Sequence, residues 1–155
     1  SEEAMEALTI YRDAIQYVHD QTIRLMNEGY YPDQIVEMVE LPDSIKSSPF
    51  LSEFYGTVRW SVKSIFNGYL GWFNGNPSDL DPLSRKEEAQ KFAKLLGGEE
   101  LLLEALEKSV FDEDMQWALE LSDKLLALNY STDKVNKLRQ KALLYIGLRA
   151  SNPNK

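Results

Sequence analysis

The fold of this chain is decided by residues 53–77, which read EFYGTVRWSVKSIFNGYLGWFNGNP. Apolar residues recur here at steps of three and four, the spacing of one helix face: Val58, Val62, Ile65, Tyr69 and Trp72 or Phe73. Further apolar residues cover much of the remaining circumference, which predicts a helix buried on several sides. The helix is expected to stop at residues 74–77, because Gly and Asn accept left-handed backbone and Pro cannot continue a helix.

Helical periodicity continues on both sides of this stretch. Residues 4–28 predict one long helix, and residues 35–39 predict a short one that leads into a loop. A capping box at Ser84 and Glu87 begins the first of four further helices, which ends at the glycine pair 97–98. Asp112 is expected to cap the third of these helices. Because no stretch alternates with period two, the predicted fold class is all-α, a helical bundle.

The chain is interpreted as a single helical domain over residues 1–155, with a first part at 1–77 and helical hairpins at 84–150. The Pro- and Asp-rich connection 78–83 is the expected subdomain boundary. Trp117-Ala118 followed by Ala142 fits weakly with the 34-residue tetratricopeptide pattern. The C-terminal region is therefore expected to be tetratricopeptide-like hairpins, without a repeat array.

The net charge of −8 over 155 residues argues against nucleic acid or an anionic membrane as the partner. No apolar run approaches the roughly 20 residues that span a bilayer. There is no cysteine, which excludes disulfides and thiolate metal sites.

Catalytic chemistry is not expected from this chain. His19 is its only histidine, whereas catalytic zinc sites usually take two or three. Adjacent helix positions do not face each other, so a dyad of His19 with Asp20 is not expected. The sequence therefore predicts no catalytic residue, no metal ligand and no cofactor within the chain, and places His19 on a helix face or interface.

Several motifs in a fixed order carry a resemblance to a known family. They are residues 11–22 (YRDAIQYVHDQT), 25–29, Leu41-Pro42, 55–58 (YGTV), 69–73 (YLGWF) and 75–77 (GNP), followed by Gly97-Gly98 and the Trp117 helix. Together they resemble the dimerisation domain of alkyl sulfatases in the metallo-β-lactamase superfamily. The resemblance covers nearly the whole chain.

This resemblance implies an enzyme of three parts, of which the chain is the middle one. In the family, an N-terminal domain binds two zinc ions and hydrolyses sulfate esters such as dodecyl sulfate, and a C-terminal sterol-carrier-like domain receives the alkyl chain. The family's Tyr before Gly-Thr-Val lies near the active-site mouth, and this position is Tyr55 here. Arg59, one turn further on, could add charge-assisted binding of the sulfate. Relatives carry His-Asn where this chain has Trp60-Ser61, which implies a differently shaped mouth.

The resemblance also implies two partners, a second copy of the chain and the zinc hydrolase domain of the same parent chain. The long first helix and the aromatic central helix are the predicted dimer interface, and the candidate residues are Leu8, Tyr11, Ile15, Val18, Trp60 and Trp72. The alternative is a tetratricopeptide-like module that binds a protein or peptide. A dimer would favour the first hypothesis, and a monomer with an open groove would favour the second.

Overall fold

The computed structural model describes residues 2–53 and 56–150, and every regular element in those ranges is helical. The predicted all-α class is therefore confirmed. The chain divides into two compact units, Ser1–Asp81 and Pro82–Lys155, and the division falls inside the connection expected at 78–83. No helix in the described ranges is long and apolar enough to cross a membrane.

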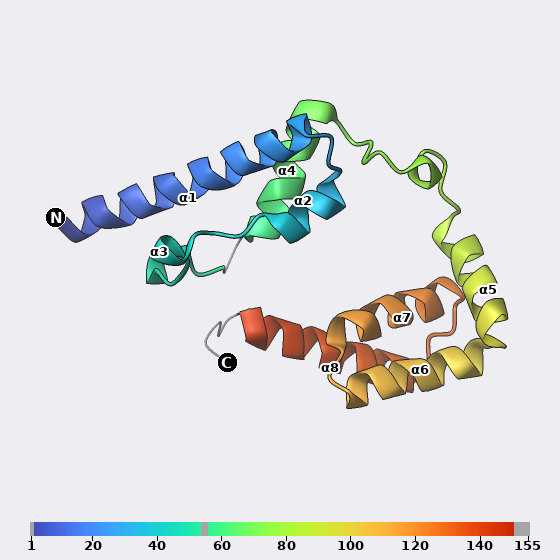
Figure 1. The fold of residues 1–155 in the computed structure, drawn as a ribbon. Coiled ribbons are helices and arrows are strands. Elements are labelled where there is room, and N and C mark those ends of the chain that lie inside the picture. Colours follow the sequence, from blue (N-terminus) through green and yellow to red (C-terminus); the bar gives the residue numbers. More distant parts are fainter. Residues whose placement is uncertain (1, 54–55, 151–155) are drawn as a thin grey trace. The chain divides into compact units, whose positions relative to one another are not determined.

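Unit 1 is built from one long helix and several shorter ones (Figure 1). They are α1 (Glu2–Asn27), α2 (Pro32–Met38), α3 (Asp43–Lys46), η1 (Pro49–Leu51), α4 (Val58–Leu70) and η2 (Pro77–Asp79). α1 and α2 both pack on α4. The buried side chains between them are Val18, Leu25, Ile35, Val36, Val39, Val62 and Phe66.

The central helix α4 differs from its prediction in two respects. It ends at Leu70, because Gly71 leaves the helix with φ +82° while its N–H still bonds to the Asn67 carbonyl. Trp72 therefore lies beyond the helix, and the segment at 74–77 is not what stops it. Only Val62 and Phe66 of α4 are buried, so the expectation of burial on several sides is wrong for this unit. The reason is that α1 and α2 cover one side of α4 only.

Two short elements occupy the region expected to be a loop. α3 and η1 lie between α2 and α4, and Ser48 caps η1 by accepting a hydrogen bond from the Phe50 N–H. The N-terminus of α4 is capped twice: Thr57 Oγ1 accepts from the Trp60 N–H, and the Glu53 carboxylate accepts from the Val58 N–H at 2.8 Å. These caps fix where α4 begins.

The described part of unit 2, residues 82–150, consists of four successive helices: α5 (Arg85–Leu96), α6 (Glu99–Phe111), α7 (Met115–Ala127) and α8 (Asp133–Ala150). α7 contacts each of the other three helices. The buried core is Leu102, Leu106, Val110, Met115, Ala118, Leu121, Leu125, Val135 and Ala142. The tetratricopeptide-like detail of these hairpins stays a prediction.

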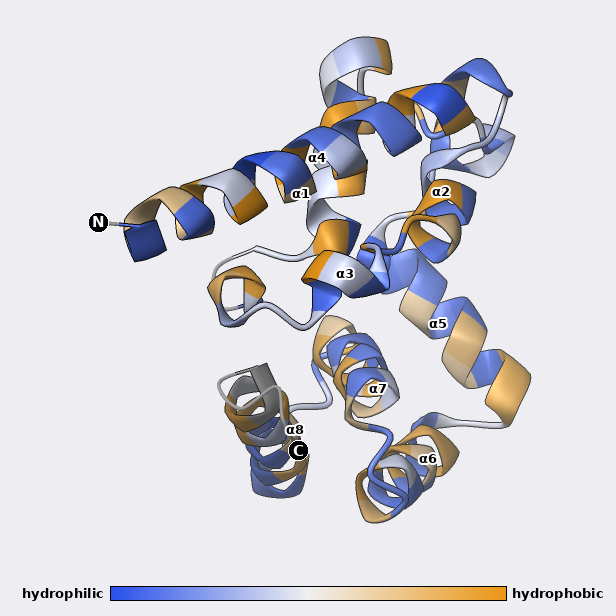
Figure 2. Cartoon of the chain, turned by 60° about the vertical axis from the view of Figure 1, so that its left-hand side comes forward, coloured by the Kyte–Doolittle hydropathy of each residue, from blue (hydrophilic) through white to orange (hydrophobic). Residues whose placement is uncertain are grey.

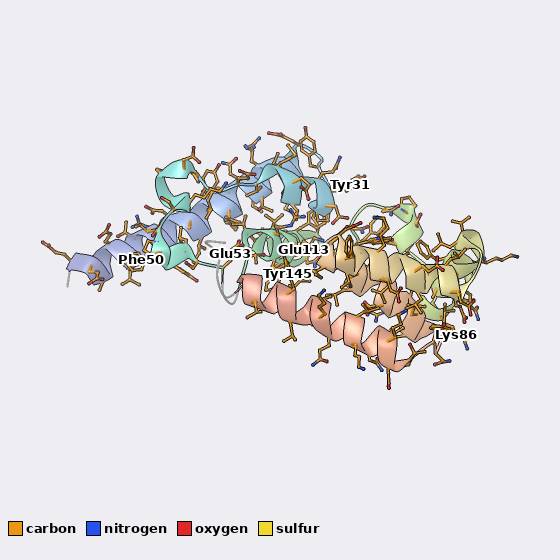
Figure 3. All side chains as sticks on the ribbon, turned by 90° about the horizontal axis from the view of Figure 1, so that it is seen from below. Tyr31, Phe50, Glu53, Lys86, Glu113 and Tyr145 are labelled. Atoms are coloured by element: carbon orange, nitrogen blue, oxygen red, sulfur yellow. The ribbon has the colours of Figure 1, made fainter. Side chains whose placement is uncertain are left out.

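The ends of these helices follow their local chemistry. The Ser84–Glu87 capping box is confirmed, and α5 ends at Gly97 in left-handed conformation. The predicted cap Asp112 is wrong: Asp112 follows the end of α6, and Asp114 caps α7 by accepting from the Trp117 N–H. Between them Glu113 takes φ +62°, and its carboxylate accepts a hydrogen bond from the Tyr145 hydroxyl of α8 at 3.1 Å (Figure 3).

The capping box gives unit 2 a pH dependence that can be measured. Hydrogen bonds from the Ser84 side chain and N–H lower the pKa of Glu87. A lowered pKa in the folded state means that the ionised cap stabilises the fold above the ordinary pKa of a glutamate, and that this contribution is lost as the pH falls through the folded-state value. We expect Glu87→Gln to be less stable than the parent at neutral pH and equal to it in acid, measured by urea denaturation at both pH values. Glu104→Gln, on the exposed side of α6, is the control and should show a smaller difference.

Candidate functional site

The apolar face of α1 continues beyond the helices that cover it. All buried residues of α1 lie from Ala14 onward, and Val18 and Leu25 face α4 and α2. Leu8, Tyr11 and Ile15 continue the same face at steps of three and four, yet they are 67%, 54% and 61% exposed. Figures 1 and 2 show these early turns of α1 extending past α4 with hydrophobic residues along them. Three large apolar side chains beside the buried face thus stand exposed over about two turns of α1.

A hydrogen bond connects this face to the end of α4. His19, four residues after Ile15, places Nε2 3.0 Å from the hydroxyl of Tyr69, and the two rings lie 5.8 Å apart between centroids. The other ring nitrogen, Nδ1, lies 3.1 Å from Oδ1 of Asp20. The expectation that His19 and Asp20 do not meet is therefore wrong. Their Cβ atoms diverge along the helix, but both side chains are long enough to turn towards each other at the exposed edge.

These residues define one surface, which we call the α1–α4 surface: Leu8, Tyr11, Ile15, His19 and Tyr69. Trp72 follows two residues after α4 and is strongly exposed. The loop that carries Trp72 passes Tyr31 at Gly75, whose backbone lies so close to the Tyr31 ring that a side chain at position 75 would clash with it. Gly75 also has φ +87°, so the lack of room for a side chain and the left-handed backbone both favour glycine there.

The other predicted interface residues lie elsewhere in unit 1. Val18 is buried in the core with α2 and α4. Trp60 is exposed and lies about half a turn round α4 from the buried Val62. Sequence reasoning missed Tyr69 as an exposed residue, because its helical spacing placed it among core positions. The spacing of His19 from Ile15 was the signal that could have placed His19 on this surface.

The two cations of α4 are paired with acids of α2. Arg59 Nη2 lies 2.7 Å from Glu37 Oε1, and Lys63 Nζ lies 3.1 Å from Asp33 Oδ1. Both pairs are largely exposed, and such pairs contribute little to stability. Arg59 keeps further N–H donors, so anion binding by Arg59 stays a prediction. Tyr55, the other predicted substrate contact, lies outside the described residues.

Two further features of the described residues bear on the binding of metals or small molecules. Within residues 2–53 and 56–150, no group of three or more His, Cys, Asp or Glu side chains could hold a metal ion. A hollow between α5 and α7 is lined mostly by charged residues: Arg85, Glu88, Glu120, Asp123 and Lys124, with Ala127. There Lys124 Nζ lies 2.8 Å from Glu88 Oε1 and 5.1 Å from the centre of the Phe92 ring. The contact between Lys124 and Glu88 ties α5 to α7.

Comparisons with known proteins place the all-helical fold in a family. The sequence model of the alkyl sulfatase dimerisation family matches residues 31–155. The chain belongs to the alkyl sulfatase dimerisation family. The family match begins after α1, so it does not include the helix that carries Leu8, Tyr11 and Ile15.

Individual relatives extend the match over α1. The chain is 40% identical over 154 residues to a linear primary-alkylsulfatase of a Pseudomonas species, covering 99% of this chain and 29% of that protein. It is 30% identical to an alkyl/aryl-sulfatase of Saccharomyces cerevisiae, covering 94% of this chain and 22% of that protein. The structure of a stereoselective inverting sec-alkylsulfatase from Pseudomonas matches with a TM-score of 0.81 and 25% identity, over 90% of this chain and 22% of that one. The chain thus spans less than a third of these relatives.

Proposed function

We propose that this chain is the non-catalytic dimerisation module of a zinc-dependent alkyl sulfatase, and that it joins two copies through the α1–α4 surface. The observation that carries the proposal is the uncovered part of α1. An apolar face that is core in one half of a helix and exposed in the other is typical of a helix that completes its packing against a partner. In a two-fold dimer each copy presents the same face to the other.

The area of this surface indicates how much of unit 1 takes part. With on the order of 100 Å² of exposed apolar area for each large side chain, Leu8, Tyr11 and Ile15 supply about 300 Å² per copy. A stable interface buries about 800 Å² per partner. The end of α4 carries the exposed Tyr69, which contacts His19 of α1, and the exposed Trp72 follows it. We therefore propose that both take part in the contact.

The chemistry of the parent enzyme is assigned to other domains. The residues described here do not fit a zinc site, because they include one histidine and no cluster of ligands. The zinc ions are accordingly proposed to reside in the hydrolase domain of the same parent, acting on sulfate esters of alkyl chains. The present chain would hold that domain in the dimer and shape the mouth of its active site, with Arg59 and Tyr55 as the candidate contacts to sulfate.

The stoichiometry of the chain tests this proposal. We expect light scattering behind size exclusion to give the mass of two 17.8 kDa chains over a wide range of loading concentrations. A folded monomer at every concentration would contradict self-association of this module. That result would favour the tetratricopeptide-like alternative, in which unit 2 binds an extended peptide as a monomer. Circular dichroism of the same samples would separate a folded monomer from an unfolded chain.

A further inference from the structure

The single histidine of the chain lies within the α1–α4 surface, and its surroundings fix which nitrogen carries the proton when it is neutral. The Asp20 carboxylate can only accept a hydrogen bond, so Nδ1 of His19 must donate to it. Nε2 is then a bare acceptor, and the Tyr69 hydroxyl must donate to it. In this state the ring nitrogens of His19 and the hydroxyl proton of Tyr69 are all satisfied within unit 1.

Protonation of His19 reverses the second hydrogen bond. Nε2 then carries a hydrogen and donates to the Tyr69 oxygen, so the Tyr69 O–H has to find another acceptor. Water supplies that acceptor while Tyr69 is exposed, as it is in the single chain. A contact that excludes water removes this acceptor, and a donor left unpaired in a dry contact is costly. The imidazolium charge would also lose hydration there.

The charged groups on the neighbouring elements are engaged elsewhere. On α1, Arg12 pairs with Asp13 and Arg24 pairs with Glu28. On α4, Arg59 and Lys63 pair with Glu37 and Asp33 of α2, one to three turns before Tyr69. η1, the other element packed on α1, carries no ionisable side chain. Asp20 and Tyr69 are therefore the groups that interact directly with His19 when it is protonated.

We propose that His19 makes self-association through the α1–α4 surface depend on pH, with the neutral imidazole favouring the dimer and protonation releasing it. This inference rests on the proposed function of the surface. Histidine is the side chain whose charge normally changes between about pH 5 and 8.

The background effect of pH has the opposite sign. At neutral pH each copy carries a net charge of −8, so two copies repel each other. Acidification reduces this repulsion and by itself tightens the dimer. A dimer that weakens on acidification therefore cannot be explained by overall charge, which makes the direction of the change informative.

The test compares dissociation constants from sedimentation equilibrium at about pH 7.5 and about pH 5.5, at constant ionic strength. We expect the dimer of the parent chain to be about tenfold weaker, or more, at the lower pH. His19→Gln, which stays neutral and can still accept from Tyr69, should form a dimer whose affinity does not fall on acidification. Tyr69→Phe should lose part of the response, whereas the matched control Tyr145→Phe in unit 2 should keep all of it.

Two results would overturn the inference. One is a parent dimer that is as tight at the lower pH as at the higher. The other is a His19→Gln dimer that weakens as much as the parent. Absence of a dimer at both pH values is a separate outcome, because it would overturn the proposed function itself. Helicity measured at both pH values shows whether unfolding, rather than dissociation, has occurred.

Discussion

Replacing Ile15 by Glu is expected to convert the dimer to monomers, raising its dissociation constant at least about 100-fold. The change places a carboxylate in the middle of the proposed contact, where an unpaired charge costs several kcal/mol. The monomer should remain folded, because Ile15 is exposed in unit 1 and glutamate is a good helix former. Sedimentation equilibrium measures the first effect, and circular dichroism measures the second. Tyr11→Glu should act in the same way.

A matched variant on the same helix separates the effect of position from that of charge. Thr9→Glu adds the same charge about a third of a turn away from the α1–α4 surface, at another exposed position. It should leave the dissociation constant within a fewfold of the parent value. If Thr9→Glu and Ile15→Glu weakened the dimer equally, the contact would not lie on the face that Leu8, Tyr11 and Ile15 define.

The largest expected effect on stability lies in unit 2. Leu125 of α7 is fully buried among the helices of this unit, so Leu125→Ala should lower the free energy of unfolding of unit 2 by about 3 kcal/mol. The loss combines the transfer free energy of the removed methyl groups with the cavity they leave. Trp117 lies on α7. Its fluorescence in urea, with Trp60 and Trp72 replaced by Phe, would report on unit 2.

Leu95→Ala is the control for this experiment, because Leu95 lies in the same unit and is 84% exposed. It should change the free energy of unfolding by less than about 0.5 kcal/mol. An equal loss in both variants would mean that Leu95 is covered by something in solution. No loss in Leu125→Ala would contradict the packing of α7 against its neighbours.

Local chemistry made much of the fold predictable from sequence. The capping box at Ser84 and the glycine pair at 97–98 act within a few residues, so they fixed the ends of α5 correctly. The end of α4 was wrong because two stop signals competed, and Gly71 acts before the segment at 74–77 is reached. The cap of α7 was misplaced by two residues, because Glu113 accepts the left-handed conformation usually given to glycine.

The candidate surface was less predictable, because exposure depends on which neighbours are present. The periodicity that runs from Leu8 through Val18 is continuous, and nothing in it shows where the cover by α4 ends. The pairing of His19 with Tyr69 joins residues fifty positions apart, which no local pattern contains. The spacing rule for helices also excluded the contact with Asp20, although flexible side chains can meet at an exposed edge.

The uncovered turns of α1 bear on how the molecule would assemble as well as on what it binds. No residue of α1 before Ala14 is fully buried, and Ala7 and Ile10 are only half-buried, so these turns gain less from packing than the later turns and rely more on helical propensity. Isolated helical stretches shorter than about 12–15 residues are marginal in water. Contact with a partner would thus further order residues 2–13 while it covers their apolar side chains. The conformational entropy lost in that ordering would oppose assembly. Amide hydrogen exchange along residues 2–13 would then be rapid in the single chain and slow in the assembled one.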